Sequence, residues 1–208
     1  MSHLTLSLVV KPKLLGKFLQ LLQKGVNVTG RIGSTVRSFL CDDLGLSPEY
    51  LDKRIQTLFL NGKAIDNPDT ALLKEDSTLA LSAAMPGLLG ATLRKGGFYA
   101  KMRSEISHQE QTQGIVLHEG LVLLKLFNLL PAEIGPAILE RGIWLKGEEL
   151  SRLLKDLSDE LGEGCTEAKV NGQWVHLETV AEKISKDELL LIKIQSASST
   201  AGNRRENP

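Results

Sequence analysis

Two stretches of the chain decide the fold: "LFLNGKAIDNPDTALLKEDSTLALSAA", residues 58–84, and "AKVNGQWVHLETVAEKISKDELLLIKI", residues 168–194. Both begin with an apolar run, pass through Asn-Gly and a polar segment, and end in an apolar run. Asn-Gly supplies the positive φ angles that a tight β-hairpin turn requires. The spacing is regular as well, because Asn171 follows Asn61 by 110 residues. The repeated pattern predicts an internal duplication.

The residues before the first stretch predict two strands and two helices. Residues 3–11, "HLTLSLVVK", are rich in β-favouring side chains. A helix is expected over residues 12–25, since Pro12 suits a first turn, Gly25 suits a C-terminal stop, and leucines recur on one face. Residues 26–32, "VNVTGRI", predict a second strand, and Ser34 or Thr35 is expected to cap a second helix.

The second copy is expected to follow the same order. We assign "GIVLHEG" (114–120) to a strand, "LVLLKLFNLLP" (121–131) to a helix, "RGIWLKG" (141–147) to a strand and "EELSRLLKDLSDELG" (148–162) to a helix. Gly142 follows Gly25 by 117 residues, and this larger offset is attributed to an insertion, "AEIGPAILER". Glu148 and Glu149 would favour the start of the last helix through its dipole.

A connecting segment lies between the two copies. "ATLR" and "FYAKMRSEI" flank "KGG" and predict a β-hairpin. The predicted organisation is therefore a first domain over residues 1–90, a connecting hairpin over 91–113 and a second domain over 114–195. Residues 196–208 are small and polar, and we expect them to form a disordered tail.

Composition narrows the function classes. The 208 residues carry 25 basic and 25 acidic side chains, and this neutral balance argues against nucleic acid or an anionic membrane as a partner. Two cysteines cannot build a disulfide framework, which fits a reducing compartment. The longest apolar run, residues 120–131, is too short to span a bilayer. We expect a cytoplasmic protein.

The expected order of strand, helix, strand, helix and further strands places a helix on one face of a mixed sheet, which is an α+β arrangement. Residues 4–97 resemble the sulfur-carrier proteins of the ubiquitin-like β-grasp superfamily, of the molybdopterin-synthase small-subunit type. The resemblance is carried by "LSLVVKPKLLGKFL", "GSTVRSFL", "LFLNGKAI" and "LLKEDSTLAL". Residues 114–194 resemble them more weakly. The resemblance implies two tandem β-grasp halves joined by the hairpin.

The resemblance also directs attention to "LRKGG", residues 93–97. The family's carriers end in a free Gly-Gly carboxylate, whereas 111 residues follow Gly97 here. One interpretation is a precursor that is cleaved after Gly97; the other is a loop whose glycines allow positive φ. We favour the loop, because "FYAKMRSEI" would pair with "ATLR" and because cleavage would discard the second copy.

No residue cluster indicates catalysis, a metal or a cofactor. The four histidines and two cysteines lack the spacing of metal ligands, and neither a P-loop nor a nucleophile elbow is present. Trp144 and Trp174 occur only in the second copy, and they indicate either core packing or a binding face that the first copy lacks. The candidate binding residues lie in the connecting segment: Pro86, Gly87, Arg94, Lys95, Gly96, Gly97, Lys101 and Arg103.

These observations favour a non-enzymatic module that binds another protein through a sheet face or edge. A homodimer through the hairpin is a second assembly to consider, and a small-molecule pocket between the halves is a third idea. The alternative function is a sulfur-carrier or modifier precursor in cofactor biosynthesis, with Gly97 as its processed end.

Overall fold

The computed structural model describes residues 3–84, 87–97, 116–177, 179–180 and 184–197. The first part of the chain forms β1 (Thr5–Val10), α1 (Pro12–Leu19), α2 (Leu21–Lys24), β2 (Val26–Ile32), α3 (Val36–Ser38), the π-helical turn η1 (Phe39–Asp43), α4 (Pro48–Lys53), β3 (Thr57–Leu60), β4 (Lys63–Ala64), β5 (Thr78–Ser82) and α5 (Gly87–Leu93). The second part forms β6 (His118–Phe127), α6 (Leu130–Arg141), β7 (Ile143–Lys146), α7 (Gly147–Asp156), α8 (Ser158–Gly164), β8 (Cys165–Val170), β9 (Gln173–Trp174) and β10 (Leu189–Ser196).

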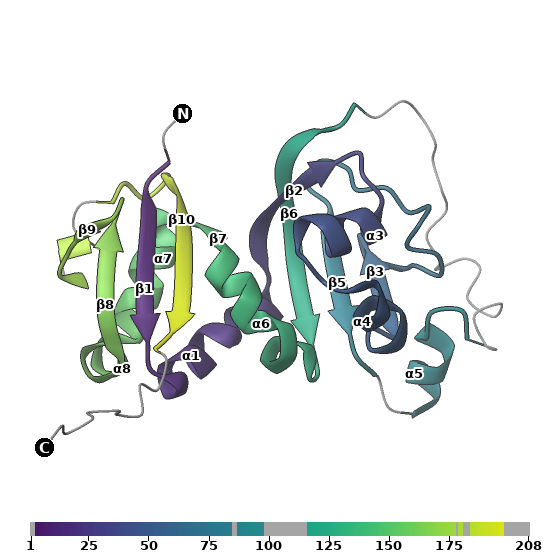
Figure 1. Ribbon diagram of the computed structural model, residues 1–208, viewed down its shortest axis with the longest axis horizontal. Helices are drawn as coiled ribbons and strands as arrows, with labels where there is room; N and C mark the ends of the chain where they lie inside the picture. The colour runs from purple at the N-terminus through teal and green to yellow at the C-terminus, as the bar shows by residue number, and fades with distance from the viewer. Residues whose placement is uncertain (1–2, 85–86, 98–115, 178, 181–183, 198–208) are drawn as a thin grey trace, which may run out of the picture.

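All the named strands belong to one mixed sheet, and the chain is a mixed α and β protein as predicted. The strand order is β4-β3-β5-β6-β2-β7-β10-β1-β8-β9. We call β4, β3, β5, β6 and β2 the first half-sheet, and β7, β10, β1, β8 and β9 the second half-sheet. They join where β2 meets β7, through the single pair Asn27 and Trp144. Figure 1 shows the two half-sheets on either side of α1 and α6.

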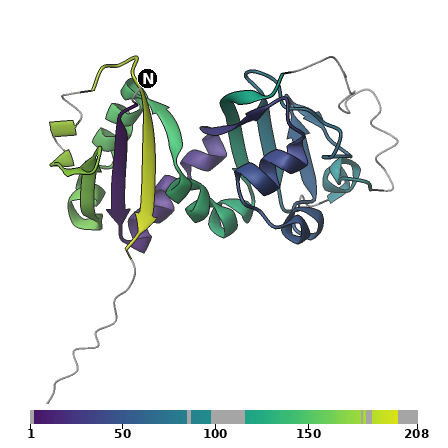
Figure 2. The same cartoon turned by 45° about the horizontal axis from the view of Figure 1, so that its top comes forward.

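The two half-sheets exchange strands between the two parts of the sequence. β1 lies in the second half-sheet, parallel to β10 and antiparallel to β8. β6 lies in the first half-sheet, antiparallel to β2 and parallel to β5. The chain therefore crosses twice, from β1 through α1 and α2 to β2, and from β6 through α6 to β7 (Figures 1 and 2). The sheet consequently does not divide at residue 90.

Registers in the two half-sheets correspond. Leu60 of β3 pairs with Leu79 of β5, and Val170 of β8 pairs with Leu6 of β1. The Asn-Gly turns that follow repeat this relation, because Asn61 Oδ1 accepts from Thr78 N at 2.8 Å and Asn171 Oδ1 accepts from Thr5 N at 2.9 Å. β1 thus occupies in the second half-sheet the position that β5 occupies in the first.

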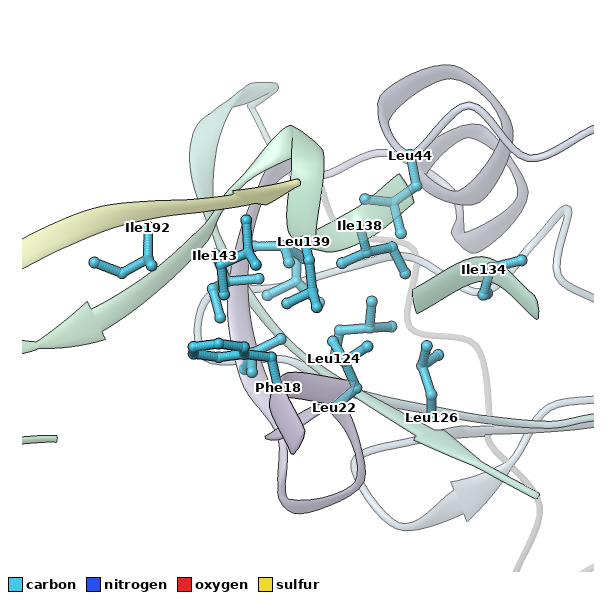
Figure 3. Packing of buried hydrophobic residues seen from close by; sticks show 14 of the residues in the cluster. Phe18, Leu22, Leu44, Leu124, Leu126, Ile134, Ile138, Leu139, Ile143 and Ile192 are labelled. Carbon is cyan, nitrogen blue, oxygen red and sulfur yellow. The ribbon is translucent and has the colours of Figure 1, made fainter. Parts of the chain in front are cut away.

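The connecting helices form the middle of the core. The first begins with Pro12 at its first turn and stops at Gly25, whose φ of 115° would strain any other residue. α1 packs against α6, and Gly135 permits a close approach, because a Cβ there would lie 2.6 Å from the Leu19 side chain. Around this contact gather buried side chains from both parts of the sequence, shown in Figure 3: Phe18, Leu22, Leu124, Leu126, Ile138, Leu139, Ile143 and Ile192.

This shared packing unites the two half-sheets in one hydrophobic cluster. Phe18, Leu22 and Leu124 are all fully buried. Burying one large apolar side chain stabilises a fold by roughly 1.5–3 kcal/mol, so the central layer supplies a large part of the cohesion.

Residues 121–127 form a strand, and the prediction of a helix there is wrong. They belong to β6, in which Val122, Leu124 and Leu126 are fully buried while alternate residues are partly exposed. This is the two-residue period of a strand. A short continuous apolar run does not separate the two structures by pattern alone. The segment "AEIGPAILER", predicted as an insertion, is instead the body of α6, the counterpart of α1 and α2.

The connecting segment also differs from the prediction. Ala91, Thr92 and Leu93 end the helix α5 and do not form a hairpin strand, and residues 98–113 lie outside the described residues. Three consecutive residues of moderate β-propensity give way to helix here, since propensity is weaker than tertiary context. At the other end β10 extends to Ser196, one residue into the predicted tail, and residues 198–208 are not described.

Across the described residues, none of the helices has the length and apolar character that crossing a bilayer would require.

Candidate functional site

The segment 93–97 lies against the first half-sheet. The Lys95 amide donates to the carbonyl of Gln56 at 2.7 Å, and Lys95 Nζ donates to the carbonyl of Leu51 at 3.0 Å. The Gly96 amide donates to Asp66 Oδ1 at 3.2 Å. These bonds tie the segment to α4, to the residue before β3 and to the residues after β4. We call residues 93–97 the cover segment.

Charges around Lys95 are arranged to receive a cation. Its side chain is 15% exposed, and Asp52 Oδ1 lies 4.0 Å from Nζ. Burial lowers the pKa of Lys95, and the carboxylate of Asp52 opposes that effect. Asp52 is also held by Arg37 at 2.8 Å, and this hydrogen bond is the main reason that the pKa of Asp52 is lowered.

The structure brings some of the predicted binding residues together. Arg94, Lys95, Gly96 and Gly97 form one packed turn, in which the Gly97 amide donates to the carbonyl of Arg94 at 3.1 Å, and Leu93 is buried. Gly96 has a φ of 60°, a conformation that favours glycine. Gly87 begins α5. Pro86, Lys101 and Arg103 lie outside the described residues.

A cavity of about 800 Å³ opens in the second half-sheet, between α7, α8 and the edge formed by β8 and β9. Its apolar lining comes from Leu154, Leu161, Ala168, Val175 and Leu177. The polar and charged lining comes from Ser151, Lys155, Ser158, Thr166, Glu167 and His176, with Cys165 and Trp174 completing the wall. A volume of this size is typical of a small-ligand or peptide-side-chain site.

Trp174 is the most conspicuous part of this wall. Its side chain is 66% exposed, although a tryptophan carries much apolar surface. Lys169 Nζ lies 4.2 Å from the ring centroid and is held there by Glu167 at 2.9 Å. The ring therefore stands at the rim of the cavity with one cation beside it.

The sequence did not predict this cavity, although one signal was present. Trp174 occurs only in the second copy, and of the two interpretations given for the tryptophans, an exposed binding face fits Trp174 better. Trp144 fits the packing interpretation, because its Nε1 donates to Thr29 Oγ1 at 2.8 Å and its ring meets His3 edge to face. A helix was expected over residues 148–162, but no pattern in it indicates that its end and β8 enclose a hollow.

The cysteine and histidine side chains do not combine into reactive groups among the described residues. Burial raises the pKa of both Cys165 and Cys41, which disfavours the reactive thiolate. His118 bonds to Glu75, and this bond raises its pKa. In the part of the chain that the structure describes, no three His, Cys, Asp or Glu side chains are placed to hold a metal ion.

One polar cluster links the helices of the first half-sheet to the central layer. Tyr50 and Arg54 of α4 both contact Glu133 of α6, the tyrosine hydroxyl donating at 2.6 Å and Arg54 Nε at 2.9 Å. The guanidinium of Arg54, and then Tyr50, lower the pKa of Glu133 to about 2. The cluster fixes α4 against α6 and is a structural feature.

Comparison with known proteins leaves the geometry to stand alone: no family model, no curated protein and no solved structure matches the chain.

Proposed function

We propose that this protein is a non-enzymatic scaffold that binds another protein, and that it is built from two β-grasp-like units. The first half-sheet has the β-grasp order if β6 stands for the opening strand, because a central parallel pair, β6 and β5, is flanked by antiparallel β2 and β3. The second half-sheet repeats that pattern of directions with β10 and β1 as its parallel pair.

The observation that carries the binding role is the cavity at the β9 end of the sheet. It combines an apolar floor with an exposed Trp174 and the backbone of an outer strand. Proteins that bind peptides by strand addition use such an edge for main-chain bonds and adjacent pockets for side chains. Tryptophan is also enriched among the residues that dominate binding energy at interfaces.

The strand exchange argues against the precursor alternative. A chain cut after Gly97 would leave residues 1–97 without β6, which lies between β2 and β5. The released piece would therefore lack a central strand, and its own β1 is bonded to β8 and β10. The cover segment is also packed, so Gly97 does not form a free end.

Site-specific photo-crosslinking in the native cell tests the proposal. p-Benzoylphenylalanine replaces Trp174 in one strain, and it replaces Lys63 in a control strain; Lys63 is an exposed residue on β4, at the opposite end of the sheet. We expect a discrete protein adduct from position 174 and none from position 63. Absence of an adduct at position 174 would contradict the binding role.

Intact mass of the same samples tests the precursor alternative. We expect the full-length chain of 22.7 kDa. A species that ends at Gly97 would overturn the scaffold proposal and favour the carrier.

A further inference from the structure

Positions in the two half-sheets correspond one to one around the edge strands. Leu60 corresponds to Val170 through their equivalent pairings, and Asn61 corresponds to Asn171, 110 residues later. The same offset relates the bond from Ile65 N to Leu58 O, 2.8 Å, to the bond from Val175 N to Ala168 O, 3.1 Å. It also aligns α4 with α8, since their first residues are Pro48 and Ser158.

This correspondence places the cavity where the cover segment lies in the first half-sheet. The cover segment contacts four residues there, through the Lys95 and Gly96 bonds already described: Leu51, Asp52, Gln56 and Asp66. Their counterparts at the offset of 110 are Leu161, Gly162, Thr166 and His176. All four counterparts line the cavity.

The connectivity explains why the second half-sheet lacks such a cover among the described residues. In the first half-sheet the cover segment comes from the chain that follows β5. The strand in the corresponding position of the second half-sheet is β1, and the chain after β1 enters α1 and crosses to the other side. The exchange therefore removes the segment that would fill this place.

The charges at the two places differ. Asp52 and Asp66, which receive Lys95 and the Gly96 amide, have Gly162 and His176 as counterparts. The cavity adds Lys155 from α7, while Glu167, the carboxylate among its described lining residues, pairs with Lys169. A cation is received in the first half-sheet, and a carboxylate is the complementary group in the second.

We propose that the cavity binds a segment of a partner protein that resembles the cover segment in shape, with an apolar side chain followed by extended backbone, and that carries a carboxylate where Lys95 has its ammonium. The apolar side chain enters between Leu154, Leu161 and Ala168, as Leu93 is buried in the first half-sheet. The backbone runs along the edge of β8 at Thr166, and the carboxylate faces Lys155 and His176. This inference rests on the proposed function.

The chain's own C-terminal residues are poor candidates for this place. Residues 198–208, "SSTAGNRRENP", contain no large apolar side chain and two arginines. A second copy of the cover segment would bring Lys95 toward Lys155, so charge disfavours it as well.

Peptide binding to the full-length chain tests the inference. The probes are two fluorescein-labelled peptides, GLLGATLRKGG, which copies residues 87–97, and GLLGATLREGG, in which the Lys95 position is glutamate. Fluorescence anisotropy at low salt should show the glutamate peptide binding about fivefold tighter, the upper range for one partly exposed charge pair. Trp174→Ala should weaken both peptides.

The charge assignment has its own matched pair of variants. Lys155→Glu should reverse the preference between the two peptides, whereas Lys63→Glu, the same charge change at the opposite end of the sheet, should leave it unchanged. Circular dichroism of each variant shows that the fold is retained.

Three results would overturn the inference. If the lysine peptide binds more tightly, the charge assignment fails and a second copy of the chain becomes the better occupant. If Lys155→Glu leaves the preference unaltered, the cavity is not the place of binding. If neither peptide binds while photo-adducts form at position 174, the occupant's chemistry is wrong although the scaffold function survives; loss of both signals removes both proposals.

Discussion

Two asparagines set the geometry of both outer hairpins at the scale of single residues. Asn61 and Asn171 have φ angles of 51° and 48°, and each is followed by a glycine with positive φ. Their side chains have equivalent roles, since each accepts from the first amide of the neighbouring strand, Thr78 in one case and Thr5 in the other. The sequence predicted both turns, because Asn-Gly has few conformational alternatives.

Replacing Asn171 with alanine should lower the free energy of unfolding by roughly 1–2 kcal/mol. Alanine is disfavoured in the left-handed region, and the bond to the Thr5 amide is lost. Urea denaturation measures the change. Asn171→Gly also loses the bond but tolerates the backbone, so it should cost less than the alanine variant. Equal stability of Asn171→Ala and the parent would contradict the role given to this turn.

Glu133 should stabilise the fold in a pH-dependent way. Its pKa is lowered from 4.5 in the unfolded chain to about 2, so its contribution is present above pH 4.5 and is lost as the pH falls through 2. The side chain is 30% exposed, which limits the contribution to about 1 kcal/mol.

Glu133→Gln should therefore destabilise the protein near pH 7 and approach the parent in stability as the pH falls from 4.5 to 2. Thermal denaturation across this range measures the difference. Glu140→Gln, on the same helix, serves as the control and should show little pH-dependent difference. A difference for Glu133→Gln that stays constant with pH would contradict the ion-pair assignment.

At the scale of elements, helices with clear ends were predictable and apolar runs were not. Pro12 and Gly25 delimit α1 and α2, and Thr35 caps α3 by accepting from the Ser38 amide at 3.1 Å. Residues 121–127 offered no such signal, and their strand character follows from burial between β2 and β5. That burial depends on long-range pairing, which a local pattern does not contain.

The packing of β2 against η1 gives a prediction at this scale. A Cβ at Gly30 would overlap the ring of Phe39, whose side chain is fully buried. Gly30→Ala should therefore lower the free energy of unfolding by about 1–3 kcal/mol through overpacking. Chemical denaturation monitored by circular dichroism provides the measurement.

Gly16→Ala is the matched control for that substitution. Gly16 lies in α1, and a Cβ added there would meet no described atom within 4 Å beyond its own helix backbone. Alanine should raise stability by about 0.5–1 kcal/mol, because it restricts the unfolded chain and favours a helix. If Gly30→Ala were as stable as Gly16→Ala, the close approach of β2 to Phe39 would be refuted.

At the scale of the whole molecule, the duplication was visible in the sequence and the exchange of strands was not. The 110-residue spacing of the Asn-Gly pairs marked equivalent turns correctly. Nothing in β1 or β6 distinguishes pairing within a copy from pairing across copies, since both arrangements bury the same apolar faces. The cavity depends on this exchange, so the sequence offered only Trp174 as an indication of it.

Cutting the chain between β5 and β6 should leave a stable complex. A protease site inserted between residues 107 and 108 would yield one fragment that supplies β1 to the second half-sheet and another that supplies β6 to the first. Size-exclusion chromatography should show the fragments eluting together, as the uncut chain does, and separating only in denaturant. Two folded fragments that separate in buffer would contradict the exchange.

The most direct test of the strand exchange is the set of cross-strand backbone NOEs in the full-length protein. The account predicts contacts of Leu8 with Ala168, and of Val28 with Val122. Contacts between β1 and β2, as a hairpin confined to the first 90 residues would give, together with loss of the Leu8 to Ala168 signal, would contradict it.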